Sequence, residues 1–186
     1  MIYFKEFPEL QCTPEFGQKY LLDNLPDPFH SNEPQVDHIL AANKGWFNIG
    51  PYGIQMHYCD KDDSRWEYFK PITDKLAIIP KYAAFIKSDA GTGPIHVDIE
   101  SRVGALNFPV YGEWDKSYVK FWDSEEGNYE VSERWYPSTN CGGLFRATAW
   151  HQVINKNPGS RIVMSFHWDE SYSFEYLCDN LLKKDL

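Results

Sequence analysis

Residues 151–168 read His151-Gln-Val-Ile-Asn-Lys-Asn-Pro-Gly-Ser-Arg-Ile-Val-Met-Ser-Phe-His-Trp168, which is two apolar runs around a polar centre. The central Asn-Pro-Gly-Ser segment has the residue types that favour a turn, so we expect neighbouring strands on either side of it. The second run, from Arg161 to Trp168, has the apolar content of a buried strand. This stretch therefore predicts a sheet with a buried face.

The same character extends back to Trp46. Short apolar runs, including a second buried strand expected from Lys75 to Lys87, are separated by clusters of Gly, Pro, Asn, Asp, Glu, Lys and Ser. These clusters lie at 50–53, 61–64, 91–94 and 125–128. Such spacing is typical of an antiparallel sandwich or barrel, so we expect an all-β core over about 46–168.

Helical patterns flank this core on both sides. Thr13 and Pro14 have the residue types of a helix start, and a helical part is expected over about 13–44. Its first helix would bury Phe16, Tyr20, Leu21 and Leu25. A second helix, starting after Ser31 or Asn32, would bury Val36, Ile39 and Leu40. A last helix over about 173–184 would bury Phe174, Leu177, Cys178, Leu181 and Leu182. With a short strand in residues 1–7 and no repeat or linker, residues 1–186 are expected to form a single domain.

Composition limits the class of protein. The formal net charge of −9 disfavours non-specific binding to nucleic acid or to an anionic membrane, and no apolar stretch is long enough to span a bilayer. The four cysteines contain no C-x-x-C pair, and the N-terminus lacks a secretion signal. We therefore expect a cytoplasmic protein with reduced thiols and with neither a nucleic-acid nor a membrane partner.

The tripeptide His96-Val97-Asp98 has the spacing of two metal ligands. Residues two apart on a strand point to the same side. Non-haem iron(II) that activates oxygen is held by two neutral imidazoles and one carboxylate, which leave other coordination positions open. A chance H-x-D is common, however, and His167-Trp168-Asp169 is a second one.

The order of residues along the chain separates the two tripeptides. A third ligand must come from a later strand, and no histidine follows His167. His151 lies more than fifty residues after His96, which leaves room for the intervening strands. The predicted metal ligands, which are also the predicted catalytic residues, are therefore His96, Asp98 and His151.

Arg161 follows His151 by ten residues and opens an apolar run. A planar guanidinium can hold the far carboxylate of a dicarboxylate through two parallel hydrogen bonds. The alternative is a surface salt bridge, but burying an arginine unpaired is costly, so a specific partner explains it better. Ser165 is expected on the same strand face as Arg161, where its hydroxyl would provide a further contact to the same ligand.

Three more polar features leave alternatives open. Asn107 either faces the interior and contacts a bound ligand or satisfies backbone groups. His167 shares the strand parity of Arg161, and we expect a buried histidine bonded to a backbone carbonyl rather than a residue lining a binding site. The aromatic segment from Trp114 to Trp135 is expected to form core strands rather than a lid.

The pattern of H-x-D, a distant His and an Arg ten residues later resembles the 2-oxoglutarate- and iron(II)-dependent dioxygenases. The sequence His151-Gln-Val-Ile-Asn155 before the Arg is similar to the aspartyl/asparaginyl β-hydroxylase-like branch, as is the segment from Ser101 to Val110. The resemblance covers roughly residues 75–168.

The resemblance implies a double-stranded β-helix (a jelly roll, or cupin-like fold) that binds Fe(II), 2-oxoglutarate and O2, with ascorbate as a candidate reductant. Such an enzyme couples decarboxylation of 2-oxoglutarate to succinate and CO2 with hydroxylation of a C–H bond in a protein side chain, peptide or small molecule. Arg161 would bind the remote carboxylate of the co-substrate, with Ser165 and Asn107 as further contacts. Arg102 would bind a carboxylate of co-substrate or substrate, or else form a salt bridge at the rim.

One departure bears on the substrate. Many animal aspartyl hydroxylases lack the acid of the metal motif, whereas this chain keeps Asp98. An aspartyl side chain as the substrate is therefore in doubt. The competing functions are a cupin-type metal protein that does not use 2-oxoglutarate and a non-catalytic jelly-roll binding protein, while the oligomeric state is left open.

Overall fold

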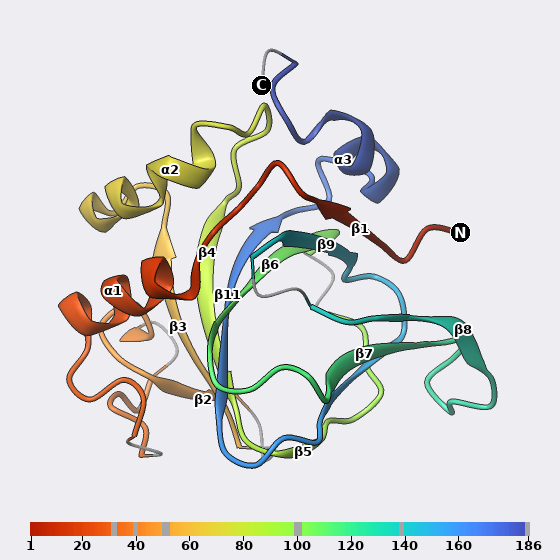
Figure 1. Cartoon of the computed structure of the whole chain (residues 1–186), viewed down its shortest axis with the longest axis horizontal. Coiled ribbons are helices and arrows are strands. Elements are labelled where there is room, and N and C mark those ends of the chain that lie inside the picture. The colour runs from red at the N-terminus through yellow and green to blue at the C-terminus, as the bar shows by residue number, and fades with distance from the viewer. Residues whose placement is uncertain (31–32, 39–40, 50–52, 99–101, 138–139, 185–186) are drawn as a thin grey trace.

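The computed structural model describes the whole chain except residues 31–32, 39–40, 50–52, 99–101, 138–139 and 185–186. Its described strands form two antiparallel sheets (Figure 1). The larger sheet contains, in spatial order, β1 (Phe4–Phe7), β9 (Gly142–Arg146), β6 (Gly104–Tyr111), β11 (Arg161–Trp168), β4 (Tyr82–Ser88), β3 (Ile54–Asp60) and β2 (Phe47–Ile49). The smaller sheet contains β5 (Gly91–Thr92), β10 (His151–Asn155), β7 (Ser117–Trp122) and β8 (Glu130–Trp135). The fold is a mainly β jelly roll, which confirms the predicted fold class.

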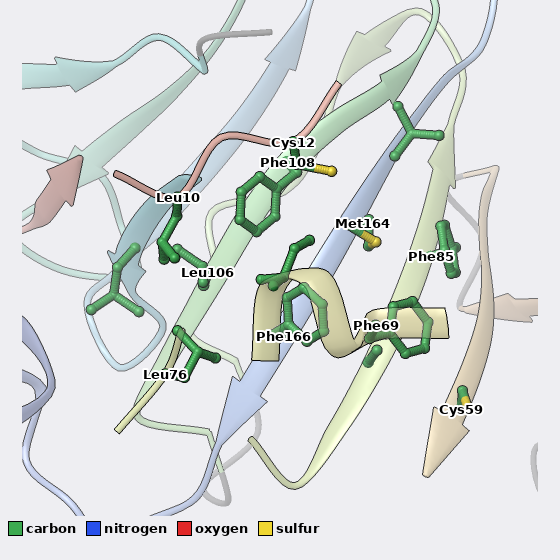
Figure 2. Close-up of a cluster of buried hydrophobic side chains, with 14 of the residues drawn as sticks. Leu10, Cys12, Cys59, Phe69, Leu76, Phe85, Leu106, Phe108, Met164 and Phe166 are labelled. Atoms are coloured by element: carbon green, nitrogen blue, oxygen red, sulfur yellow. The ribbon is translucent and has the colours of Figure 1, made fainter. Parts of the chain in front are cut away.

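The helices pack on one side of the larger sheet, and the smaller sheet lies on the other (Figure 1). They are α1 (Pro14–Asn24), η2 (Ser64–Phe69), α2 (Lys70–Thr73) and α3 (Phe174–Asn180). Alternate residues of β11 and its neighbours supply the apolar surface beneath them, as Figure 2 shows for Phe85, Met164 and Phe166. Phe69 meets Phe166 edge to face at 5.5 Å between ring centroids. Each fully buried ring of this kind stabilises the fold by about 1.5–3 kcal/mol.

A second, smaller core lies between the sheets. Phe121 and Trp135 of the smaller sheet pack with Ala105 and Phe145 of the larger one. The Trp135 ring stacks on Phe145 at 5.9 Å and covers the backbone of Gly143, where a Cβ atom would overlap with the indole. Trp135 therefore closes the seam between the edge strand β8 and the larger sheet. This result agrees with core strands, rather than a lid, in the segment 114–135.

The N-terminal helix forms as predicted, but the second helix does not appear in the described residues 33–38 and 41–45. Both Gln35 and Val36 donate their backbone N–H groups to the carbonyl of Trp46, so these groups are not available for a helical ladder. The expected contacts of Ile39 and Leu40 fall outside the described residues. At the other end of the chain, α3 stops at Asn180, several residues earlier than predicted.

Two boundaries inside the core differ from the prediction. The strand expected over 75–87 begins only at Tyr82, because Pro80 lacks the N–H group that a sheet needs. Residues 64–73 form the helical turns of η2 and α2 instead of a strand. Asp63 starts them, since its side chain accepts a hydrogen bond from the backbone N–H of Arg65 at 2.9 Å.

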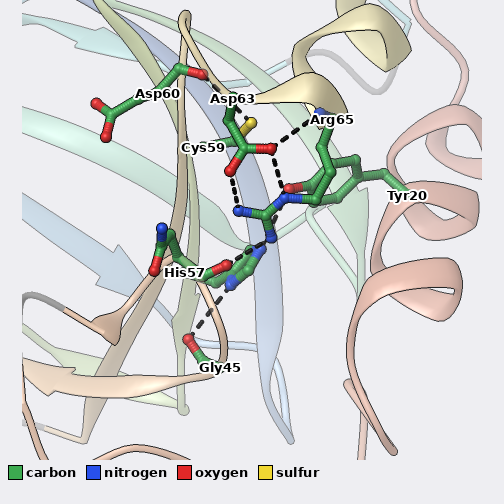
Figure 3. Close-up of polar contacts among 8 residues, drawn as sticks. Tyr20, Gly45, His57, Cys59, Asp60, Asp63 and Arg65 are labelled. Carbon is green, nitrogen blue, oxygen red and sulfur yellow. Dashed lines mark hydrogen bonds and ion pairs between the residues drawn. The ribbon is translucent and has the colours of Figure 1, made fainter.

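A buried polar network ties α1 to β3 (Figure 3). The Tyr20 hydroxyl and His57 Nε2 lie 3.3 Å apart, and His57 Nδ1 lies 3.3 Å from the carbonyl oxygen of Gly45. Beside them, Arg65 is ion-paired with Asp63. Burial lowers the pKa of His57 from 6.5 to about 4, so the imidazole is neutral at physiological pH.

The compartment is not determined by these features. In the described part of the chain, no helix is long and apolar enough to cross a membrane. Cys12, Cys59, Cys141 and Cys178 are all free thiols, and the first, second and fourth are buried.

Replacing Gly143 by Ala should destabilise the protein by about 1–3 kcal/mol, because the new methyl group collides with the buried Trp135 indole. The measurement is the free energy of unfolding in urea. Gly93→Ala is the matched control, since its Cβ would meet only Val153 O at an ordinary 3.4 Å. Equal stability of the two variants would contradict the packing described for the seam.

The folded state should lose stability between pH 7 and pH 5 because of His57. Its pKa is lower in the folded protein than in the unfolded chain, so the unfolded chain binds the proton more tightly. The stability that neutral His57 contributes is therefore fully present above pH 6.5 and is lost as the pH drops toward 4. The loss in the free energy of unfolding reaches about 2 kcal/mol at pH 5. Urea unfolding of wild type and His57→Phe at both pH values tests this. The variant should be less stable at pH 7 but should change less with pH.

Candidate metal centre

The three predicted metal ligands come from two chain segments that are joined by backbone hydrogen bonds. His151 opens β10, whereas His96 and Asp98 lie in the irregular segment between β5 and β6. His96 N donates to His151 O at 2.9 Å, and His151 N donates to His96 O at 2.8 Å. Asp98 N donates to Ala147 O at 2.9 Å. In place of the strand expected through His96 and Asp98, the structure has an isolated bridge between His96 and His151, beside which the side chains of His96 and Asp98 still point to one side.

The ligand atoms of this cluster converge. Asp98 Oδ1 lies 3.6 Å from His96 Nε2 and 3.9 Å from His151 Nε2, and the three ligand atoms are all within 4.8 Å of one another. Two imidazoles and one carboxylate at this spacing match the donor set that iron(II) oxygenases use.

The imidazole tautomers suit a metal. Nδ1 of His96 lies 3.0 Å from Pro94 O, and Nδ1 of His151 lies 2.9 Å from Ala149 O. A carbonyl oxygen can only accept a hydrogen bond, so each Nδ1 carries the proton and each Nε2 keeps its lone pair. Both lone pairs belong to the atoms nearest to Asp98, and the residues therefore fit a bound cation.

Electrostatics keep the carboxylate charged and one imidazole neutral. Burial raises the pKa of Asp98, but the neighbouring imidazole of His96 and the positive charge of Arg102 outweigh it and lower that pKa to about 2. Burial lowers the pKa of His151, against the opposing charge of Asp98. The neighbouring carboxylate of Asp98 raises the pKa of His96, so a proton on Nε2 competes with a cation for this ligand.

The inner face of the larger sheet carries the predicted co-substrate residues opposite this cluster. Ser165 on β11 is paired with Asn107 on β6, and both side chains are buried. Ser165 Oγ and Asn107 Oδ1 have no hydrogen-bond partner in the described part of the chain. Because unpartnered buried polar atoms are rare in folded proteins, these two mark a place for a polar ligand. Neither atom satisfies the backbone, which was the alternative for Asn107.

Arg161 is buried on the same face and is 5% exposed. Its Nε donates to Ser88 Oγ at 3.2 Å, and its guanidinium lies 4.7 Å from the centroid of the Trp114 ring. No carboxylate of the described residues forms an ion pair with it. Burial lowers its pKa to about 10, which still leaves the group charged at neutral pH. The alternative of a surface salt bridge is therefore wrong.

Arg102 lies at the metal end of the site. Its Nη1 is 3.8 Å from Asp98 Oδ2, and its guanidinium lies 5.6 Å from the centroid of Tyr82. The salt bridge that was one alternative for Arg102 therefore involves a predicted metal ligand. The rival tripeptide is not assembled, because Asp169 pairs with Lys81 at the surface, at 3.7 Å.

His167 does not have the partner expected for it. Among the described residues, neither of its ring nitrogens has a hydrogen bond, although the side chain is buried. Its ring stacks on Tyr82 at 4.7 Å. The contributions of Ser88, Tyr82 and Trp114 were also missed. Strand parity identifies Ser88 and Tyr82 only when the partner strand is known, and the loop position of Trp114 gives no sequence signal at all.

Comparisons with known proteins find solved structures that share the fold of this chain. The chain matches no protein-family model and no curated protein. A prolyl hydroxylase from Trichoplax adhaerens, solved with a hypoxia-inducible-factor peptide fragment, superposes with a TM-score of 0.54 at 11% identity over 90% of this chain and 84% of its own. A prolyl-4-hydroxylase from Pseudomonas putida superposes with a TM-score of 0.50 at 11% identity, over 89% of this chain and 92% of the hydroxylase chain. The chain shares their fold. At these identities the likeness establishes the fold alone.

A divalent metal ion should raise the stability of the wild-type protein, because an ion that binds only the folded state stabilises it by about 2.7 kcal/mol at a hundred times its dissociation constant. His151→Ala should abolish this gain, whereas His30→Ala, at an exposed position, should keep it. The measurement is thermal unfolding with and without Mn²⁺, with calorimetry for the stoichiometry. An unchanged metal response in His151→Ala would rule out this ligand set.

Proposed function

We propose that this protein is an Fe(II)- and 2-oxoglutarate-dependent oxygenase that hydroxylates a C–H bond of a peptide, a protein side chain or a small molecule. The observation that carries the proposal is the buried, charged Arg161, which faces the interior between the sheets without a carboxylate partner among the described residues. Burying an unpaired guanidinium is costly, and a carboxylate that binds to it offsets that cost.

The arrangement supports 2-oxoglutarate as the dicarboxylate. Arg161 would bind the remote carboxylate through parallel hydrogen bonds, with Trp114 stacked on its guanidinium and Ser88 fixing Nε. Ser165 lies on the same face of β11 as Arg161 and is paired with Asn107, and the unpartnered oxygens of both residues would contact the co-substrate. A metal protein without 2-oxoglutarate gives no reason for these three buried groups.

His96, Asp98 and His151 would hold the iron through ligand atoms that all lie within 4.8 Å of one another. The iron and 2-oxoglutarate, with O2, supply the oxidising chemistry and release succinate and CO2. The protein contributes orientation and exclusion of water. Pro94 O and Ala149 O fix the imidazole rings, and Arg102 holds the second oxygen of Asp98.

Arg102 is proposed to bind a carboxylate of the co-substrate. Arg102 lies beside Asp98, so any carboxylate that it binds sits at the metal end of the site, which suits the co-substrate's metal-binding end. The resemblance to the aspartyl/asparaginyl branch rests on sequence segments alone and stays a prediction. Ascorbate likewise enters only as a reductant for the assay.

Arg161→Ala should weaken 2-oxoglutarate binding by at least about thirtyfold, because removing one partner of a buried charged pair typically costs about 2–5 kcal/mol. The measurement is calorimetry with the Mn²⁺-loaded protein, which needs no substrate. Arg134→Ala, at an exposed position on β8, is the matched control and should bind normally. Arg161→Lys should recover only part of the affinity, since it keeps the charge but loses the bidentate geometry.

Turnover provides the second part of this test. Wild-type protein with Fe(II), ascorbate and 2-oxoglutarate should release succinate, and a substrate panel should increase the rate. The inactive reference is His151→Ala. The proposal would be refuted if wild-type protein released no more succinate than His151→Ala with every substrate of the panel, and if Arg161→Ala also bound 2-oxoglutarate as tightly as wild type.

A further inference from the structure

His167 is a buried polar residue of the inner sheet face to which the proposed chemistry gives no role. It lies near the end of β11 that is remote from Arg161, and it is 1% exposed. Neither Nδ1 nor Nε2 has a hydrogen-bond partner in the described part of the chain. Leaving two buried polar atoms unpaired costs free energy, so a bound group that pairs with them would be favoured.

The neighbours of His167 connect it to the metal ligand Asp98 through the side chains of Tyr82 and Arg102. Its ring stacks on that of Tyr82, with centroids 4.7 Å apart and planes at 20°. The Tyr82 ring lies 5.6 Å from the guanidinium of Arg102, which in turn lies 3.8 Å from Asp98 Oδ2. The stacking fixes the imidazole plane and leaves the ring edge, where both nitrogens lie, available for hydrogen bonding.

The co-substrate bound to Arg161 does not fill this end of the strand. Six residues separate Arg161 from His167, which corresponds to about 20 Å along a strand. The guanidinium stays at its own end because it contacts Ser88 and Trp114 there. A small dicarboxylate anchored at Arg161 covers only part of that length, so it leaves the nitrogens of His167 for another molecule.

The chemistry of His167 indicates what that molecule presents. Burial, together with the charge of Arg102, lowers the pKa of His167 to about 3, so the ring is neutral. A neutral imidazole offers one N–H donor and one acceptor nitrogen. A carboxylate can only accept and an ammonium group can only donate, so each would leave one nitrogen unpaired. A hydroxyl group supplies both on a single oxygen, which cannot face two ring nitrogens that point in different directions. An amide supplies a donor and an acceptor on separate atoms, its nitrogen and its oxygen.

We propose that His167 is a specificity-determining residue that hydrogen-bonds amide groups of the substrate next to the metal centre. The substrate class is therefore an amide compound, such as a peptide segment or a carboxamide. This inference rests on the proposed function, since it takes the Arg161 end of the interior as the co-substrate site.

The first experiment observes His167 directly. The protein is labelled with ¹⁵N-histidine, loaded with diamagnetic Zn²⁺ and 2-oxoglutarate, and the His167 signals are assigned with His167→Phe. N-methylacetamide represents a backbone amide and acetamide a side-chain carboxamide, each added at tens of millimolar because such small probes bind weakly. At least one amide should shift the His167 nitrogens saturably, and the stronger of the two identifies the source. Acetate and methylammonium should leave them unchanged. No shift with either amide, or an equal shift with acetate, would overturn the proposal.

The second experiment uses variants and separates this inference from the proposed function. His167→Phe keeps the aromatic stacking and should bind Mn²⁺ and 2-oxoglutarate within about twofold of wild type, as should the exposed control His30→Phe. With a panel of blocked peptides and carboxamides, the increase in succinate release should fall at least tenfold in His167→Phe, which is the loss expected when a hydrogen bond to the substrate is removed. His167→Gln, which again offers a donor and an acceptor, should recover part of it.

The outcomes are distinguishable. A His167→Phe variant that binds the co-substrate and responds to the panel as wild type does would exclude the role of His167 while leaving the oxygenase intact. A wild-type protein that binds neither metal nor 2-oxoglutarate would refute the proposed function, and the inference that depends on it would fall with it.

Discussion

The alternation of side chains along β11 is the constraint on which both the fold and the candidate site depend. One set of residues, which includes Met164 and Phe166, lies in the apolar core beneath the helices. The other set, Arg161, Ser165 and His167, faces the smaller sheet. A shift of one residue in register would exchange the two sets and would bury charged and polar groups among aromatic rings. Pairing with β4 and β6 on both edges prevents that shift.

The metal end of the site depends on a much smaller element. His96 and His151 exchange two backbone hydrogen bonds across an isolated bridge, and the same two residues hold their rings through nearby carbonyl oxygens. Because backbone groups fix both position and tautomer, the cluster is arranged before any ion arrives. The affinity for a cation is then not reduced by the cost of ordering these side chains.

Local sequence patterns predicted the features that depend only on strand parity and on the order of residues along the chain. Arg161–Trp168 forms a strand with the expected bounds, and the chain order of His96, Asp98 and His151 was sufficient to select three residues that meet in space. Patterns failed where tertiary contacts override them. Gln35 and Val36 bond to a distant carbonyl, and the spacing of Trp66, Phe69 and Ile72 was overlooked although it marks one face of the η2–α2 turns. The lack of hydrogen-bond partners for His167 among the described residues depends on the residues that β4 and β6 place around it. A single sequence does not show which strands these are.

The unpartnered oxygens of Ser165 and Asn107 place ligand binding and folding stability in competition. Each keeps a polar atom out of water without a hydrogen bond from the described residues, so the ligand-free protein is less stable than the same fold with apolar residues there. Selection for stability alone would remove such groups, because most proteins tolerate stabilising changes away from function. That both lie on the inner sheet face together with Arg161 therefore indicates selection for binding a polar ligand.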